Sequence, residues 1–250
     1  MARISKADYE TVAVTCDHCG AECVFNRREN FTNIGPYAGE NVACPHCHRD
    51  FRMIGDTINP PYELFISAAR EYFRGKRYML ATANIGQAWE LFFFTFAGGK
   101  YLYRPFFLSP MGKRDLDRLN ALHCHLDQAL RKFTFNPLRN LLVNTVVQAV
   151  APQTLDEAAQ AIDKIASANL GADPSPSVIS TVADPDIRQV LECLLALSIG
   201  NLRNRVLHHR AYRPLRAEVD HCLEDEVLLL YRARTILGVR SFEELRAGLV

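Results

Sequence analysis

The sequence lacks both a long apolar run and a strong net charge. No window of the 250 residues reaches the roughly 18 uninterrupted apolar residues that a membrane-spanning helix needs. The opening MARISKADYE lacks the apolar core of a secretory signal peptide. The formal net charge is only +1, so any affinity for nucleic acid must reside in a local patch and not in a general basic coat. We therefore expect a cytoplasmic protein.

The sequence also lacks any internal repeat of fixed period, and its composition excludes a disordered chain. Apolar residues make up 48% of the sequence, and a chain of this length can bury a sizeable core. The length suits one large domain together with a small module.

Four of the eight cysteines form two closely spaced pairs, CDHC and CPHC, with 24 residues between them. Two Cys-x-x-Cys turns can direct four thiolates at one ion about 2.3 Å away, in the tetrahedral geometry of a closed structural zinc site. Two disulfides would instead need an oxidising compartment, which the missing signal peptide argues against. We therefore predict a structural zinc ion bound by Cys16, Cys19, Cys44 and Cys47.

Other residues near these pairs have weaker claims as ligands. Gly20 and Pro45 are turn residues that this geometry favours. Three histidines could replace a cysteine, but four thiolates already complete the shell, so we expect exposed turn residues at His18, His46 and His48. For the same reason we expect Cys23 not to be a ligand.

Short strand-like segments accompany the cysteine pairs, in TVAVTC, ECVFN and DFRMIG. Residues 1 to 58 therefore resemble a zinc ribbon, a small fold of β-hairpins. Some ribbons bind nucleic acid or protein and others only stabilise a fold, so the role of this one stays open.

The chain beyond Asn59-Pro60-Pro61 has the pattern of a helical bundle. Apolar residues recur at spacings of three and four over 62–75, 77–97, 112–133, 137–150, 154–168, 185–207 and 215–237. Breaks are expected at Gly98-Gly99, Pro110, Pro137, GADPSPS and Pro214, with the most flexible loop over 171–185. We predict a mainly α protein, in which a small β zinc ribbon (1–58) precedes an up-and-down helical bundle (59–250) with a candidate insert at 134–184.

One stretch is unusually basic. NLRNRVLHHRAYRPLR, residues 201 to 216, holds five arginines and two histidines without an acid, whereas a solvated helix face normally mixes both signs. This composition favours an anionic ligand, although cations at a helix C-terminus are also stabilised by the helix dipole. A second basic run, REYFRGKR at 70–77, carries interleaved aromatic residues and is either an extension of an RNA track or a solvated turn.

Helical geometry limits which residues of the stretch can act together. Asn204 and His208 are four apart and share a face, whereas Arg203 and His208 are five apart, about 140° around a regular helix. The latter two converge only if the helix ends or bends near Val206. Glu90 interrupts the apolar run QAWELFFF, where a buried carboxylate costs several kcal/mol unless it is paired. Glu90 therefore either meets an arginine of the basic stretch or lies at an exposed position.

Arg203-Asn204, followed after three residues by His208, resembles the signature of the HEPN superfamily: an arginine, often a polar residue, then a histidine four to six residues on. The surroundings, over about residues 62 to 240, are similar as well: an earlier helix like TANIGQAWELFFFTF, the basic turn HRAYRP, and a final amphipathic helix like LRAEVDHCLEDEVLLLYRARTIL. The resemblance implies a dimeric, metal-independent ribonuclease of the kind found among toxins and antiphage defence proteins, or a catalytically silent relative that binds RNA or a nucleotide.

The implied chemistry suits these residue types. Metal-free RNA cleavage uses the neighbouring 2′-hydroxyl as nucleophile, and needs a proton-transfer group near neutral pKa and a fixed cation at the phosphate. His208 would be the general base or acid, Arg203 the phosphate clamp, Asn204 an orienting residue and Glu90 an auxiliary partner of the arginine. His209 is the backup for His208. RNA phosphate contacts are expected from Arg205, Arg210 and Arg213.

The assignment has one departure from the family pattern, one requirement and two alternatives. Tyr212 does not fall two residues after the motif histidine, so regulation by nucleotidylation of that tyrosine is in doubt. Each chain offers one motif histidine, so a two-fold homodimer would be needed to supply both acid and base. The alternatives are a non-catalytic RNA- or nucleotide-binding module of the same fold, and a zinc-ribbon regulatory or adaptor protein whose helices only dimerise. An antitoxin or regulatory protein is a further expected partner.

Overall fold

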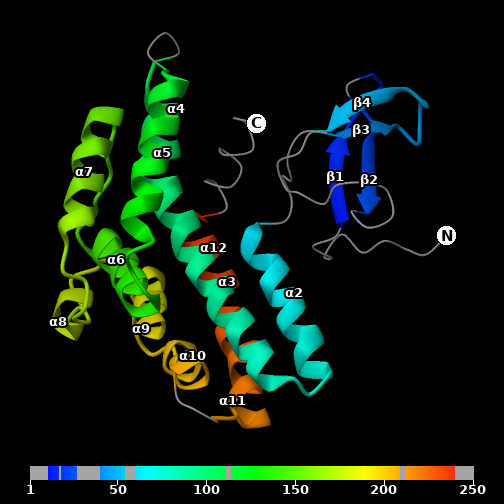
Figure 1. The fold of residues 1–250 in the computed structure, drawn as a ribbon. Helices are drawn as coiled ribbons and strands as arrows, with labels where there is room; N and C mark the ends of the chain where they lie inside the picture. The colour runs from blue at the N-terminus through cyan, green and yellow to red at the C-terminus, as the bar shows by residue number, and fades with distance from the viewer. Residues whose placement is uncertain are drawn as a thin grey trace.

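A computed structural model of the chain describes residues 11–16, 18–26, 40–53, 60–110, 114–208 and 212–239. The N-terminal module consists of two antiparallel hairpins, each its own two-stranded sheet (Figure 1). Strand β1 (Thr11–Thr15) pairs with β2 (Glu22–Asn26), and β3 (Glu40–Ala43) pairs with β4 (Asp50–Met53). One Cys-x-x-Cys pair lies at the turn of each hairpin.

The two hairpins share a very small core. The rings of Phe25 from β2 and Phe51 from β4 lie 6.3 Å apart, and the buried side chains around them are Val42 and cysteines. A core of this size stabilises a fold weakly, so such modules usually need a metal or disulfides in addition.

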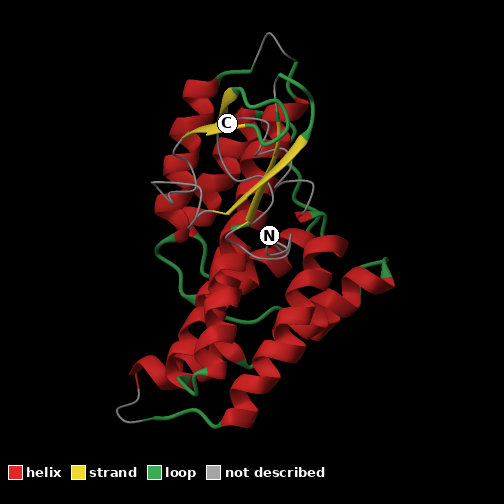
Figure 2. Ribbon diagram, turned by 90° about the vertical axis from the view of Figure 1, so that its right-hand side faces the viewer, coloured by secondary structure: helices red, strands yellow, loops and turns green. Residues whose placement is uncertain are grey.

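The rest of the described chain is helical, as expected (Figures 1 and 2). Figure 2 shows that the strands are confined to one region of a molecule otherwise built from helices. The helices are α2 (Pro61–Arg74), α3 (Tyr78–Gly98), α4 (Arg104–Leu108), α5 (Leu116–Leu130), α6 (Phe135–Val147), α7 (Leu155–Ser167), α8 (Pro176–Ile179), α9 (Pro185–Leu195), α10 (Ile199–His208), α11 (Arg216–His221) and α12 (Val227–Ile236). Two π-helical segments, η1 (Gly99–Tyr103) and η3 (Cys222–Glu226), follow α3 and α11.

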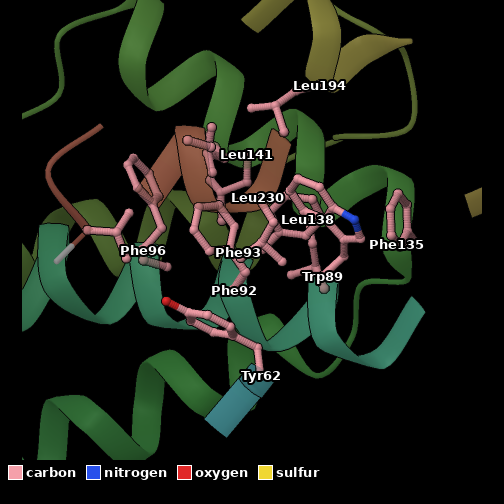
Figure 3. Packing of buried hydrophobic residues seen from close by; sticks show 14 of the residues in the cluster. Tyr62, Trp89, Phe92, Phe93, Phe96, Phe135, Leu138, Leu141, Leu194 and Leu230 are labelled. Carbon is pink, nitrogen blue, oxygen red and sulfur yellow. The ribbon is translucent and has the colours of Figure 1, made fainter. Parts of the chain in front are cut away.

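Helix α3 is the centre of the bundle and packs against α2, α6 and α10. Its apolar residues point in all directions, which is typical of a helix covered on every side. Trp89, Phe92 and Phe93 meet Tyr62 from α2 and Phe135 from α6, with mostly edge-on ring contacts (Figure 3). Within the part of the chain that the structure describes, no helix combines the length and apolar character needed to cross a bilayer.

The expected break at Gly98-Gly99 is wrong. Both glycines adopt right-handed helical angles, and the chain continues through η1 into α4. Glycine costs a helix only about 1 kcal/mol. Burial of Tyr101 and Leu102 directly after the glycines outweighs that cost.

The expected single helix over 185–207 is also wrong, because it is divided into α9 and α10. The division follows from a contact with the end of η3: the Glu226 carboxylate accepts hydrogen bonds from the backbone N–H groups of Ser198 (2.5 Å) and Ile199 (3.1 Å). These groups would otherwise be unsatisfied donors at a helix start. Glu226 therefore fixes where α10 begins.

Part of the stretch expected to be the most flexible loop is held in place. Residues 176–179 form the short helix α8, and the segment before it is bound by two buried side chains of α6. The Asn140 amide donates to the carbonyl oxygens of Leu170 (3.0 Å) and Ala172 (3.1 Å), and the Arg139 guanidinium forms an ion pair with Asp173. These bonds fasten the 168–175 segment to the bundle.

Candidate functional site

The two cysteine turns have the same backbone conformation. In each, the N–H of the first cysteine donates to the carbonyl five residues later, and its own carbonyl accepts from the N–H four residues later, all at 2.9 Å. The residue after the second cysteine has a positive φ, 69° at Gly20 and 59° at His48. Glycine adopts this conformation without strain and histidine rarely does, so the second turn takes it at some cost.

The four sulfur atoms that these turns bring together fit one metal ion. The Sγ atoms of Cys16 and Cys47 lie 3.8 Å apart, those of Cys19 and Cys44 lie 3.7 Å apart, and all four fall within 4.8 Å of one another. A tetrahedron with metal–sulfur bonds of about 2.3 Å has edges of about 3.8 Å. The arrangement therefore has the dimensions of a four-thiolate metal site.

Backbone donors complete the surroundings of the sulfur cluster. The N–H of His18 lies 3.4 Å from Cys16 Sγ, and those of His46 and Cys47 lie 3.4 Å from Cys44 Sγ. Hydrogen bonds of this kind stabilise negative charge on a thiolate. The three histidines of the turns are exposed, and none belongs to the cluster.

A fifth thiol lies beside the cluster. Cys23 is fully buried, with its Sγ 3.5 Å from that of Cys44, but it is not one of the four mutually close sulfurs. The prediction that four cysteines form the site is thus met by the geometry, and Cys23 packs against one of them.

The second candidate site lies where α10 crosses α3. The Arg203 Nη2 is 3.1 Å from Glu90 Oε1 and 3.3 Å from Oε2, and the side chains are only 18% and 12% exposed. The arginine reaches Glu90 by passing over Gly86, one helical turn earlier on the same face of α3. A Cβ at position 86 would lie 2.6 Å from Arg203 Cδ, too close for any side chain to be tolerated without a shift. Of the two positions expected for Glu90, the structure therefore has the one that meets the motif arginine.

Burial and the ion pair act on Glu90 in opposite directions. Loss of water raises the pKa of its carboxyl, and the Arg203 guanidinium opposes that rise, with burial the larger effect. Arg203 therefore offsets part of the effect that burial has on the pKa of this carboxyl.

The structure does not bring all the predicted residues to one face. Helix α10 continues without interruption through His208, so Arg203 and His208 lie about 140° apart around it. Asn204, half-buried, and His208, exposed, share a face. Arg213 is exposed, whereas His209 and Arg210 lie outside the described residues.

Arg205 belongs to a separate cluster that sequence reasoning missed. Its guanidinium lies 2.9 Å from Glu218 Oε1 and over the ring of Tyr212, 4.5 Å from the centroid. Glu218 also accepts from the Tyr212 hydroxyl (2.8 Å) and from the Leu215 N–H (2.7 Å), and the Leu215 bond is the main cause that lowers the pKa of this carboxyl. An acid in the first turn of the helix after Pro214 was the available signal. The cluster holds the chain after the motif against the start of α11.

No family model, curated protein or solved structure matches the chain.

Proposed function

We propose that the protein is a metal-independent endoribonuclease of the HEPN kind that carries an N-terminal zinc ribbon. The observation that supports it most directly is the placement of Arg203, held by Glu90 over Gly86 at the crossing of α3 and α10. Cleavage by the 2′-hydroxyl requires a fixed cation and a proton-transfer group, which the motif offers as the Arg203 guanidinium and the exposed His208.

Arg203 is suited to hold a phosphate. Glu90 contacts only Nη2, and within the described chain no partner occupies the N–H groups at Nε and Nη1. A guanidinium fixed on one edge presents the remaining N–H groups as a planar fork, which matches two oxygens of a phosphate. Glu90 would act through the arginine as a positioning residue.

His208 and Asn204 would supply proton transfer and orientation. A histidine removes the proton from the 2′-hydroxyl, the 2′-oxygen attacks phosphorus, the bond to the 5′-oxygen breaks, and an acid protonates that oxygen. The products are a 2′,3′-cyclic phosphate and a 5′-hydroxyl. No metal ion takes part in any of these steps.

A second copy of the chain would complete the site. Arg203 and His208 point in different directions from one helix, and each chain has one motif histidine. Leu207 within the motif and Leu215 after it are 51% and 69% exposed. A two-fold dimer formed here would cover these leucines and bring two motifs into one cleft.

The four-thiol site would hold a structural zinc ion, since four thiolates in a tetrahedron form the donor set that zinc favours. The ion would cross-link the two hairpins, whose shared core is small. A cytoplasmic location, a toxin or antiphage role, and control by an antitoxin or regulatory protein belong to the same proposal and rest on the resemblance.

The test is incubation of the purified protein with total RNA in EDTA, with identification of the product ends. His208→Ala should slow cleavage by about 10²-fold or more, the usual effect of losing general acid–base help. Arg203→Lys should also lose cleavage, because the lysine ammonium keeps the positive charge but cannot form two parallel hydrogen bonds to a phosphate. His123→Ala is the matched control, since His123 is an exposed histidine on α5.

Three outcomes would change the proposal. A larger loss in His209→Ala than in His208→Ala would make His209 the reacting histidine. A monomer by light scattering that still cleaves RNA would refute the shared cleft. RNA binding without cleavage of any substrate, weakened in both motif variants, would leave the non-catalytic binding module.

A further inference from the structure

The turn between α2 and α3 lies beside the start of α11, at the same end of the bundle (Figure 1). The contact is specific: the Arg216 guanidinium lies over the Phe73 ring, 5.9 Å from its centroid. This places Arg216 near the exposed cations Arg74, Lys76 and Arg77, which follow Phe73 in sequence. We call these four cations the basic end surface.

The cations of this surface differ from three arginines elsewhere in the molecule. Arg118, Arg131 and Arg232 each form a salt bridge with an aspartate. Within the described ranges, no salt bridge joins a carboxylate to any cation of the basic end surface. The surface therefore retains its positive charge for an external anion.

The turn that carries three of the cations is rigidly built. Three successive backbone N–H groups donate hydrogen bonds to carbonyl oxygens of α2: Gly75 to Glu71 (3.0 Å), Lys76 to Phe73 (2.9 Å) and Arg77 to Tyr72 (2.8 Å). Lys76 has a φ of 58°, in the left-handed region that favours glycine. Glycine would fit this position without backbone strain, so the lysine does not favour folding here. Its positive charge is the better reason for its presence.

Aromatic rings are interleaved with these charges. The rings of Phe73 and Tyr78 lie 5.6 Å apart, and both side chains are half-buried at the surface. Phosphate-binding cations alternating with rings on which bases can stack form the usual platform for single-stranded nucleic acid. Tyr78 begins α3, and Gly86 beneath Arg203 is two turns further on, about 12 Å along the helix axis.

We infer that the basic end surface binds the backbone of single-stranded RNA and extends the site at Arg203 along the substrate. This inference rests on the proposed function for the identity of the substrate, but not on cleavage. The experiment therefore measures the binding of a fluorescent 2′-O-methylated oligouridine, which has no 2′-hydroxyl nucleophile and cannot be cut.

The variant is Arg74→Gln, Lys76→Gly and Arg77→Gln in the full chain, studied by fluorescence anisotropy over a range of salt. Each cation that no longer neutralises a phosphate should lower the slope of log affinity against log salt by about 0.7, so removing three cations should lower it by about 2. The same relation gives about 100-fold weaker binding at 0.1 M salt. The matched control removes three exposed cations elsewhere, by Arg131→Gln, Lys132→Gln and Lys164→Gln, and should keep the slope of the wild-type protein.

Lys76→Gly alone separates binding from folding. It relieves the left-handed strain and should raise the Tm, yet it should weaken oligouridine binding by about fivefold at 0.1 M salt. A variant that binds less because it is damaged would instead show a lower Tm.

The inference is overturned if the triple variant keeps the wild-type affinity and slope, or if the control loses as much as the triple variant. Exposed Met79 and Leu80 adjoin the surface, and an anionic membrane is the competing ligand. Loss of binding to phosphatidylglycerol vesicles with unchanged binding to oligouridine would assign the surface to lipid. Cleavage of RNA by a triple variant that binds oligouridine normally would refute this surface and leave the proposed function standing.

Discussion

Replacing Arg203 by methionine would leave the Glu90 carboxylate in place without its cation. At the 3.1 Å separation of the pair, an effective dielectric constant of about 20 gives an attraction of about 5 kcal/mol. The cost of removing the arginine should be smaller than this attraction, because both groups are partly exposed to water and a carboxyl without a partner can take up a proton. We therefore expect Arg203→Met to lower the free energy of unfolding by about 2 to 4 kcal/mol at pH 8.

The loss should depend on pH in a defined direction. Burial raises the pKa of folded Glu90 above its ordinary value of 4.5, and removing Arg203 removes the effect that opposes the rise. A carboxyl with a raised pKa stabilises the folded state most at pH below 4.5, and that stability is lost as pH rises through the folded pKa. Relative to the double variant Glu90→Gln/Arg203→Met, the single variant should lose about 1.4 kcal/mol per pH unit across that interval.

Urea unfolding at pH 5 and pH 8 measures both quantities, with fluorescence of Trp89, the single tryptophan and a fully buried one, as the probe. Arg131→Met is the control: its pair with Asp127 is on the surface, where the arginine is 74% exposed, so the cost should stay below about 1 kcal/mol. The reasoning fails if the Glu90 and Arg203 effects add to within about 0.5 kcal/mol in the double variant, or if the loss is equal at both pH values.

Two further predictions concern the backbone crossing and the thiol cluster. Gly86→Ala should keep the helix, because alanine is the better helix former. The new Cβ would lie 2.6 Å from Arg203 Cδ, so the arginine must move until the two atoms are at least 3.4 Å apart. A shift near 1 Å should slow the proposed RNA cleavage by about 10²-fold, and an unchanged rate would show that the position of the arginine is unimportant. Elemental analysis of the reduced protein should find one zinc ion per chain, which Cys44→Ser should lose and the control Cys23→Ser should keep. Chelation of the zinc should leave the far-ultraviolet circular dichroism signal of the helices unchanged. Absence of zinc from the wild-type protein would contradict the assignment.

Features set by short-range spacing could be predicted from the sequence. Each Cys-x-x-Cys turn is local, and the need of a metal site for four thiolates implies that the two turns meet. The helical segments follow from apolar periodicity, and a lone acid within QAWELFFF predicts either a partner or exposure. The structure provides the partner, Arg203, from more than 100 residues away (|i−j| = 113).

Features set by distant contacts could not be predicted. Ser198 is a residue type that often precedes a helix, but it lies in an apolar helical pattern, and the carboxylate that divides α9 from α10 comes from the distant Glu226. The importance of Gly86 was equally hidden, since a glycine in a helix gives no indication of which side chain crosses it. The continuation of the helix through Gly98 and Gly99 depends on burial of the residues that follow.

The bond from Glu226 to the start of α10 also bears on the order of events during synthesis. The two amides that begin α10 find their acceptor in a residue that the ribosome adds 28 positions after Ser198. Glu90 is synthesised long before Arg203. When Arg203 is added, its partner is therefore already present in the nascent chain, but the start of the helix that carries Arg203 is not yet fixed. An intermediate that stops before residue 226 would carry the complete motif without the cap that fixes its helix. If the proposed RNA cleavage is correct, the messenger RNA and the ribosomal RNA would be spared until synthesis has passed residue 226.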